Sequence, residues 1–92
     1  MVERMEIVKR IPGGKTLKVE VELEKGIIKK VVFSGDFFAY PPEVFEELEE
    51  SLRYTRIEEI EEKIRKYHGK IALLGLSLED IISTLKELLE LS

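Results

Sequence analysis

The stretch TLKVEVELEKGIIKKVVFS, residues 16–34, decides the fold of this chain. Its first part, Thr16–Glu24, alternates apolar and polar residues one by one, which is the period of a strand with one buried face. Lys25 and Gly26 are expected to form a turn, because glycine readily adopts the positive φ that tight turns need. Ile27–Ser34 is rich in β-branched residues, so the stretch predicts an antiparallel hairpin.

The residues around this hairpin extend the sheet by one strand. Two adjacent apolar pairs, Ile27-Ile28 and Val31-Val32, break the alternation of the second strand, and a β-bulge is the simplest explanation. Upstream, Met5–Ile11 is a weaker strand candidate, which Pro12-Gly13-Gly14 ends. The front of the chain therefore predicts a three-stranded antiparallel meander.

The second half of the chain predicts helices. Pro42 suits the first position of one helix, whose apolar residues recur with helical period. Thr55-Arg56-Ile57-Glu58 has the pattern of a capping box and is expected to open a second helix, which Gly69 ends. Lys70–Leu76 is expected to be a short buried connector, and Ser77-Leu78-Glu79-Asp80 is the cap signal of the last helix.

Strands followed by helices predict an α+β fold, with a small three-stranded antiparallel sheet and about three helices packed on one face. Ninety-two residues are expected to form a single domain over positions 1–92. A chain of this size buries enough surface for one modest core. It is not expected to hold a deep catalytic pocket as well.

The composition excludes several classes of protein. The chain has no cysteine, which rules out disulfides, thiolate metal sites and cysteine nucleophiles. Its N-terminal residues have no apolar signal-peptide core, and the longest apolar stretch, Ile71–Leu76, is too short to span a bilayer. We therefore expect a cytoplasmic protein with no membrane partner. Abundant Glu and Lys, with Asn and Gln missing, are typical of hyperthermophiles.

Charge argues against a nucleic-acid partner. The net charge is −4, with eight Lys/Arg against six Asp/Glu in residues 1–40 and seven against thirteen in the remainder. Neutralisation of phosphates supplies most of the affinity in nucleic-acid binding, so an acidic chain is a poor candidate. The mildly basic front half could still meet an acidic partner or a small phosphate-bearing ligand.

Helix and strand patterns leave the segment from Ser34 to Pro42 unexplained. Its two adjacent phenylalanines, Phe37 and Phe38, cannot both point inward if the backbone is extended, so one is expected to be exposed and to suit a partner contact. The plainer alternative makes Gly35-Asp36 a turn, with Asp36 bonding nearby backbone N–H groups and one Phe closing the end of the core.

The run VEVELEKGIIKKVVFSGDFF, Val19–Phe38, closely resembles the C-terminal domain of lipoate–protein ligases. The pattern of that family is a strand, a Lys/Glu-Gly turn, a strand beginning with Ile, and then Gly-Asp-Phe-Phe. The element IPGGK, Ile11–Lys15, is similar to the stand-alone archaeal version of the domain. The segments YPPE and LGLSLEDI also fit, so the resemblance covers nearly the whole chain.

The resemblance implies an accessory subunit of a two-component lipoate–protein ligase. In such an enzyme the catalytic subunit uses ATP, Mg²⁺ and lipoate to make lipoyl-adenylate, and then transfers lipoate to a lysine of a lipoyl-domain acceptor protein. The small subunit is implied to be needed for the adenylation step. On its own this chain is expected to be non-catalytic and to bind no cofactor.

The resemblance also supplies the candidate site residues. These residues, expected to bind the partner or close its active site, are Lys15, Gly35, Asp36, Phe37 and Phe38. No catalytic residue and no metal ligand is predicted. Lys15 could reach a phosphate or carboxylate of the partner, or it could be an ordinary exposed hairpin lysine. Asp36 could brace a partner loop or only its own turn.

Two other hypotheses stay open. One is a protein-interaction or scaffold module unrelated to lipoate, which forms a homodimer through its sheet face or through exposed Leu and Ile of the last helix. The other is a free-standing enzyme that uses the Glu clusters of the helices, although glutamate runs at this spacing are normally solvated. The single histidine, His68, is expected to be a helix-end residue rather than a ligand.

Overall fold

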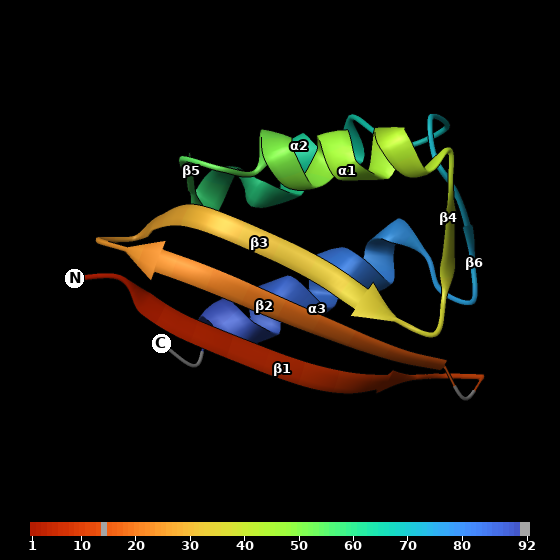
Figure 1. The fold of residues 1–92 in the computed structure, drawn as a ribbon, viewed down its shortest axis with the longest axis horizontal. Helices are drawn as coiled ribbons and strands as arrows, with labels where there is room; N and C mark the ends of the chain where they lie inside the picture. Colours follow the sequence, from red (N-terminus) through yellow and green to blue (C-terminus); the bar gives the residue numbers. More distant parts are fainter. Residues whose placement is uncertain (14, 91–92) are drawn as a thin grey trace.

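The computed structural model describes residues 1–13 and 15–90, and these form an α+β fold with a main sheet, a small second sheet and three α-helices (Figure 1). The main sheet is antiparallel in the order β1-β2-β3-β5, with bounds β1 Glu3–Ile11, β2 Lys15–Glu24, β3 Ile27–Gly35 and β5 Thr55–Arg56. The second sheet pairs β4, Phe38–Tyr40, with β6, Ala72–Leu74. The helices are α1 Pro42–Ser51, α2 Ile60–Arg65, which follows the 3₁₀ turn Ile57–Glu59, and α3 Leu78–Glu90.

The predicted hairpin is confirmed in detail. Lys25 and Gly26 both have positive φ, as a two-residue turn between antiparallel strands requires. The expected bulge lies at Lys29, because the pairing register steps from Glu22 opposite Lys30 to Leu23 opposite Ile28. The extra residue allows residues 28 and 31, which are three apart, to point into the same core.

The sheet has four strands, so the prediction of three is corrected. The fourth strand, β5, is a two-residue segment in which Thr55 pairs with Ile28 and Arg56 with Ile27. The predicted capping box at Thr55 is wrong, because Thr55 belongs to this strand and does not cap a helix. The buried hydroxyl of Thr55 bonds the carbonyl of Ser51 at 3.3 Å and accepts from the Lys63 ammonium at 3.0 Å, and no side chain caps the turn that follows.

The connector predicted over Lys70–Leu76 is also corrected. Its central residues form β6, and Leu74 is exposed rather than buried. The next prediction holds: the Ser77 hydroxyl accepts from the backbone N–H of Asp80 at 3.2 Å, and the Asp80 carboxylate accepts from the N–H of Ser77 at 2.9 Å. This reciprocal pair is a capping box and fixes the start of α3.

One core joins the sheet to the helices. The alternate residues of β2 and the apolar stripe of α3 are almost fully buried and belong to the same cluster, with α3 behind β1 and β2 and α1 alongside β3 (Figure 1). The strand residues that build it are Leu17, Val19, Val21, Leu23, Ile28, Val31 and Phe33, and the helix residues include Leu48, Ile60, Ile64, Ile81, Leu85 and Leu88. None of the helices in the described part of the chain could cross a bilayer.

Side chains from α1 and from the turn after it cover the edge of β3 that β5 leaves unpaired. The Glu49 carboxylate accepts from the backbone N–H of Phe33 at 2.8 Å, and the Arg53 guanidinium donates to the carbonyl of Lys29 at 3.1 Å. Burial raises the pKa of Glu49, an effect that the bond from Phe33 partly opposes. Satisfying exposed strand groups in this way protects an open edge.

Candidate functional site

The signature loop, Gly35–Phe38, lies at one end of the molecule between β3 and β4. Figure 1 shows this end closed by the β4–β6 pair, with the end of β1 and the start of β2 nearby. We call the pair of strands β4 and β6 the ribbon. The five residues predicted for the site, Lys15 and the signature loop, are brought to this end together, although they take different structural roles.

Gly35 is required by the packing of the backbone. Its φ is +142°, and a Cβ atom at this position would lie 2.1 Å from the carbonyl oxygen of Thr16. No side chain can be placed there without moving one strand away from the other. Gly35 therefore sets the close approach of the end of β3 to the start of β2, and it offers no side chain to a partner.

Asp36, the residue after Gly35, forms hydrogen bonds with the backbone of Thr16. Its Oδ1 accepts from the backbone N–H of Thr16 at 2.5 Å, while its own N–H donates to the carbonyl of Thr16 at 3.3 Å. The bond from Thr16 lowers the pKa of Asp36, with smaller contributions from the charges of Lys15 and Arg10. These bonds tie the signature loop to the start of β2, twenty residues earlier in the chain, rather than to a backbone N–H of the turn itself.

The two phenylalanines separate as predicted. The ring of Phe37 is half-buried and packs edge-on against Phe45 of α1, with the ring centroids 5.7 Å apart. Phe45 in turn contacts Phe33 of β3 at 6.1 Å. Phe38 is 73% exposed. One Phe thus closes the end of the core and the other faces solvent.

Lys15 is exposed and lies beside the ribbon. A Cβ atom on Gly75, the residue after β6, would lie 3.2 Å from Lys15 Cγ and 3.5 Å from Phe37 Cβ. The aliphatic stem of Lys15 therefore runs along the backbone of Gly75, which also has positive φ, +105°. This contact places a cation beside the exposed end of β6.

Two exposed residues of this end were missed by the sequence analysis. In the ribbon, Phe38 lies opposite Leu74 and Tyr40 opposite Ala72, so all four point to the same side. Tyr40 is 71% exposed and Leu74 70%. Their neighbours Ala39 and Leu73 point inward and pack against the core. The large-small-large order of residues 38–40 is the available signal, but it is too short to identify a strand.

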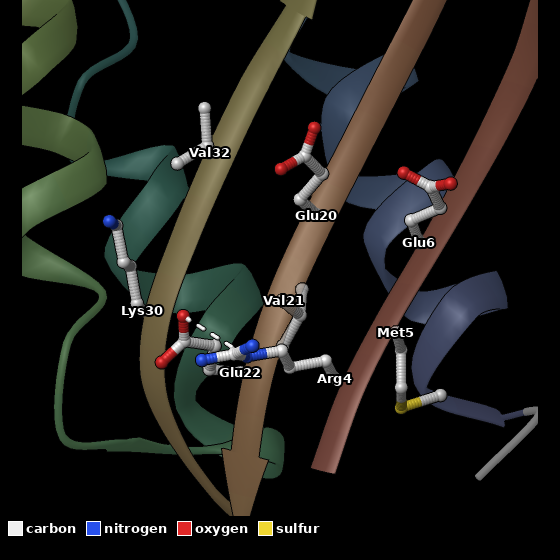
Figure 2. Close-up of a pocket in the computed structure, with 8 residues that line it drawn as sticks. All are labelled: Arg4, Met5, Glu6, Glu20, Val21, Glu22, Lys30 and Val32. Carbon is white, nitrogen blue, oxygen red and sulfur yellow. Dashed lines mark ion pairs between the residues drawn. The ribbon is translucent and has the colours of Figure 1, made fainter. Parts of the chain in front are cut away.

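The outer face of the main sheet carries a hollow of a different character (Figure 2). Charged side chains from β1, β2 and β3 line it, and Figure 2 shows Arg4 directed at Glu22, 3.8 Å away. Next to them Lys18 lies 3.2 Å from Glu20 and 3.4 Å from Glu6, which raises the pKa of Lys18. Exposed ion pairs of this kind are a solvated surface network.

The acids of the helices take part in surface ion pairs, of which those of Glu61 are an example. Glu61 pairs with Arg65 at 3.1 Å and with Lys86 at 2.8 Å. Within residues 1–13 and 15–90, His, Asp and Glu form no group of three that could hold a metal ion. His68 is exposed in the turn that follows α2.

A homodimer through the last helix is contradicted by the structure. Of the Leu and Ile residues of this helix, Leu78 is half-buried against the core, and the others are buried in the core of the same chain: Ile81, Ile82, Leu85, Leu88 and Leu89. The hydrophobic face of α3 is therefore already covered.

Comparison with known proteins gives consistent results. The family described as the bacterial lipoate protein ligase C-terminus matches residues 4–85. Lipoate-protein ligase A subunit 2 of Thermoplasma acidophilum is 34% identical over 71 residues, which is 76% of each chain. A solved chain from the bi-partite lipoate protein ligase of the same organism, studied with its E2 lipoyl domain, superposes with a TM-score of 0.75 at 31% identity, covering 92% of this chain and 94% of that one. The chain belongs to the lipoate protein ligase C-terminal family.

Proposed function

We propose that this chain is the accessory subunit of a two-component lipoate–protein ligase. With a catalytic subunit it enables the ATP-dependent activation of lipoate to lipoyl-adenylate, which precedes transfer to a lysine of a lipoyl domain. On its own the chain is non-catalytic, and we place it in the cytoplasm with its partner. The observation that carries the proposal is the likeness, over most of both chains, to subunit 2 of a ligase whose structure is bi-partite.

The chemistry of the described residues supports a non-catalytic role. Where the structure describes the chain, carboxylates form no cluster suited to Mg²⁺. The hollow of the main sheet is lined by charged and apolar side chains, and four of the charged ones are ion-paired: Arg4, Glu6, Glu20 and Glu22. A nucleotide or lipoate site needs a concave pocket with a few convergent polar groups, which this surface does not offer. In this proposal ATP, Mg²⁺ and lipoate therefore bind to the catalytic subunit.

The residues predicted for the site support the proposal through two different roles, one internal and one at the surface. Gly35, Asp36 and Phe37 shape and anchor the end of the molecule through contacts within this chain. Phe38 and Lys15 remain available to a partner. An accessory subunit that completes a neighbouring active site needs this combination of a rigid base and an exposed contact.

The test is reconstitution from purified components. The chain is mixed with a catalytic lipoate ligase subunit that lacks this domain, together with lipoate and Mg·ATP, and pyrophosphate release is followed. We expect release only when both proteins are present. Full activity of the catalytic subunit alone would reject an accessory role, and pyrophosphate release by this chain alone would reject a non-catalytic one.

A further inference from the structure

The outer face of the ribbon is an apolar surface without a partner in this chain. Phe38, Tyr40 and Leu74 are each at least 70% exposed, and the pairing of β4 with β6 places them side by side together with Ala72. Other exposed apolar residues in the described part of the chain stand at separate places, such as Val8 on β1 and Tyr54 before β5. Scattered residues need no explanation, whereas a contiguous patch does.

The exposed area of this patch is large enough to form the apolar centre of a protein interface. An aromatic side chain covers about 150–250 Å² when fully buried, so these three residues expose on the order of 400 Å². A stable interface buries about 800 Å² on each partner, with an apolar centre and a polar rim. The patch therefore supplies about half of one side, in the residue types that dominate binding energy.

The patch rests on a rigid base. On the opposite side of the ribbon Ala39 and Leu73 pack against the core, and Phe37 is held by Phe45. The capping box of Ser77 and Asp80 fixes the chain shortly after β6. A surface already ordered in the free protein loses little conformational entropy on binding, which favours affinity.

A basic rim borders the patch on the side of the signature loop. The stem of Lys15 lies against Gly75, the residue after Leu74. Arg10 lies opposite Thr16 in the β1–β2 pairing, next to the pair that Ile11 forms with Lys15. The ion pairs found among the described residues include neither Lys15 nor Arg10, while the carboxylate of Asp36 is bonded to Thr16. These cations suit a partner surface with carboxylates beside an apolar centre.

We propose that the outer face of the ribbon, Phe38, Tyr40, Ala72 and Leu74, is the docking surface for the catalytic subunit. The proposal rests on the proposed function and goes beyond it by assigning the contact. It requires the catalytic subunit to present an apolar depression bordered by carboxylates. It also separates the roles within the signature loop, because Phe38 binds the partner while Phe37 holds the fold.

The test compares binding of full-length variants to the catalytic subunit by titration calorimetry. Phe38→Ala and Leu74→Ser are each expected to raise Kd about 30-fold or more, as for a residue at the centre of an interface. Tyr54→Ala is the matched control, because Tyr54 is an aromatic residue 66% exposed beside β5, at the other end of the molecule (Figure 1). Its Kd is expected to stay within about threefold of the wild type.

Two measurements make the result independent of folding. Far-UV circular dichroism and thermal unfolding should show each variant folded. Amide hydrogen exchange of the wild-type complex should show slower exchange at residues 38–40 and 72–74 than in the free chain. This second measurement needs no substitution and so decides the question even if a variant is unstable.

The outcomes separate this proposal from the proposed function. If the wild type binds and activates the catalytic subunit while Phe38→Ala and Leu74→Ser bind equally well, the docking surface is wrong and the function stands. If the wild type neither binds nor activates, both are rejected. If light scattering shows the chain alone as a dimer that Phe38→Ala converts to a monomer, with binding of the catalytic subunit unchanged, the patch belongs to a second copy and the proposal is overturned.

Discussion

Phe37 and Phe38 are adjacent in the chain and lie on opposite sides of the backbone. The ring of Phe37 packs edge-on against Phe45 at 5.7 Å, whereas the ring of Phe38 is mostly exposed. Successive side chains of an extended segment point to opposite faces, so the pair connects the core of the molecule to its surface within two residues. Stability and binding should therefore respond to different members of the pair.

Phe37→Ala is expected to lower stability by about 2 kcal/mol, because Phe37 is half-buried and loses its contact with Phe45. For a domain of this size, such a loss corresponds to a fall of about 8–16 °C in the unfolding midpoint. Thermal unfolding followed by circular dichroism measures it. Phe38→Ala is the control and should change stability by no more than about 0.5 kcal/mol. Equal losses for the two variants would contradict the assignment.

Gly35→Ala tests the close approach of β3 to β2. A Cβ atom would lie 2.1 Å from the carbonyl oxygen of Thr16, so the strands must shift. Gly26→Ala is a matched control, because Gly26 also has positive φ but has nothing within 4 Å of the new Cβ. We expect the control to cost about 1–2 kcal/mol from backbone strain alone, and Gly35→Ala to cost about 1–3 kcal/mol more. Denaturant unfolding gives both values, and equal costs would show that the strands adjust freely.

Asp36 should make the protein sensitive to acid. The hydrogen bond from Thr16 lowers its pKa in the folded protein below the ordinary 3.8, so its contribution is complete above that pH and is lost as the pH falls through the folded pKa. In Asp36→Asn the amide oxygen still accepts from Thr16, but no charge is titrated. The stability difference between wild type and variant should therefore shrink between about pH 5 and pH 2. A constant difference across this range, measured by denaturant unfolding, would argue against the bond.

Glu49 should show the opposite dependence on pH. Burial raises its pKa above the ordinary 4.5, so its contribution to stability is greatest below that pH and declines as the pH rises through the folded pKa. Glu49→Gln keeps an acceptor for the N–H of Phe33 without a charge, and at neutral pH it should be at least as stable as the wild type. Glu49→Leu leaves that N–H unpaired and should cost about 1–2 kcal/mol. A Gln variant as unstable as the Leu variant would show that the charge itself is needed.

The parts of the fold with a long periodic signal were predictable from the sequence. The alternation of Thr16–Glu24 gave the buried face of β2, and Ser77 with Asp80 marked the start of α3. The errors fall on segments of two or three residues, β5 and β6, whose structure depends on partners distant in the chain. Thr55 has the local pattern of a helix cap. In the structure it instead pairs with Ile28 in the sheet, and its hydroxyl accepts a hydrogen bond from Lys63.

The candidate site was predictable to a similar extent. Its location followed from the family pattern, and the exposure of one Phe followed from strand geometry. The internal roles of Gly35 and Asp36 depend on the position of Thr16, nineteen and twenty residues earlier, which no local pattern reveals. Likewise Tyr40 and Leu74 become one surface only when β4 pairs with β6. Short strands joined over a long loop lack the repeated signal that sequence analysis needs.

Lys15→Glu tests the charge of the rim separately from the apolar patch. If Lys15 faces carboxylates of the catalytic subunit, reversing its charge should slow association more than it speeds dissociation, because rim charges act mainly on the encounter of two proteins. We expect the association rate constant to fall about tenfold at low ionic strength, with the difference from wild type shrinking as salt screens the charges. Stopped-flow or surface plasmon resonance at several salt concentrations measures it.

Lys25→Glu is the control, since Lys25 lies in the β2–β3 turn at the other end of β2. An equal effect of the two substitutions would indicate a response to net charge alone, and no effect of Lys15→Glu would place Lys15 outside the interface.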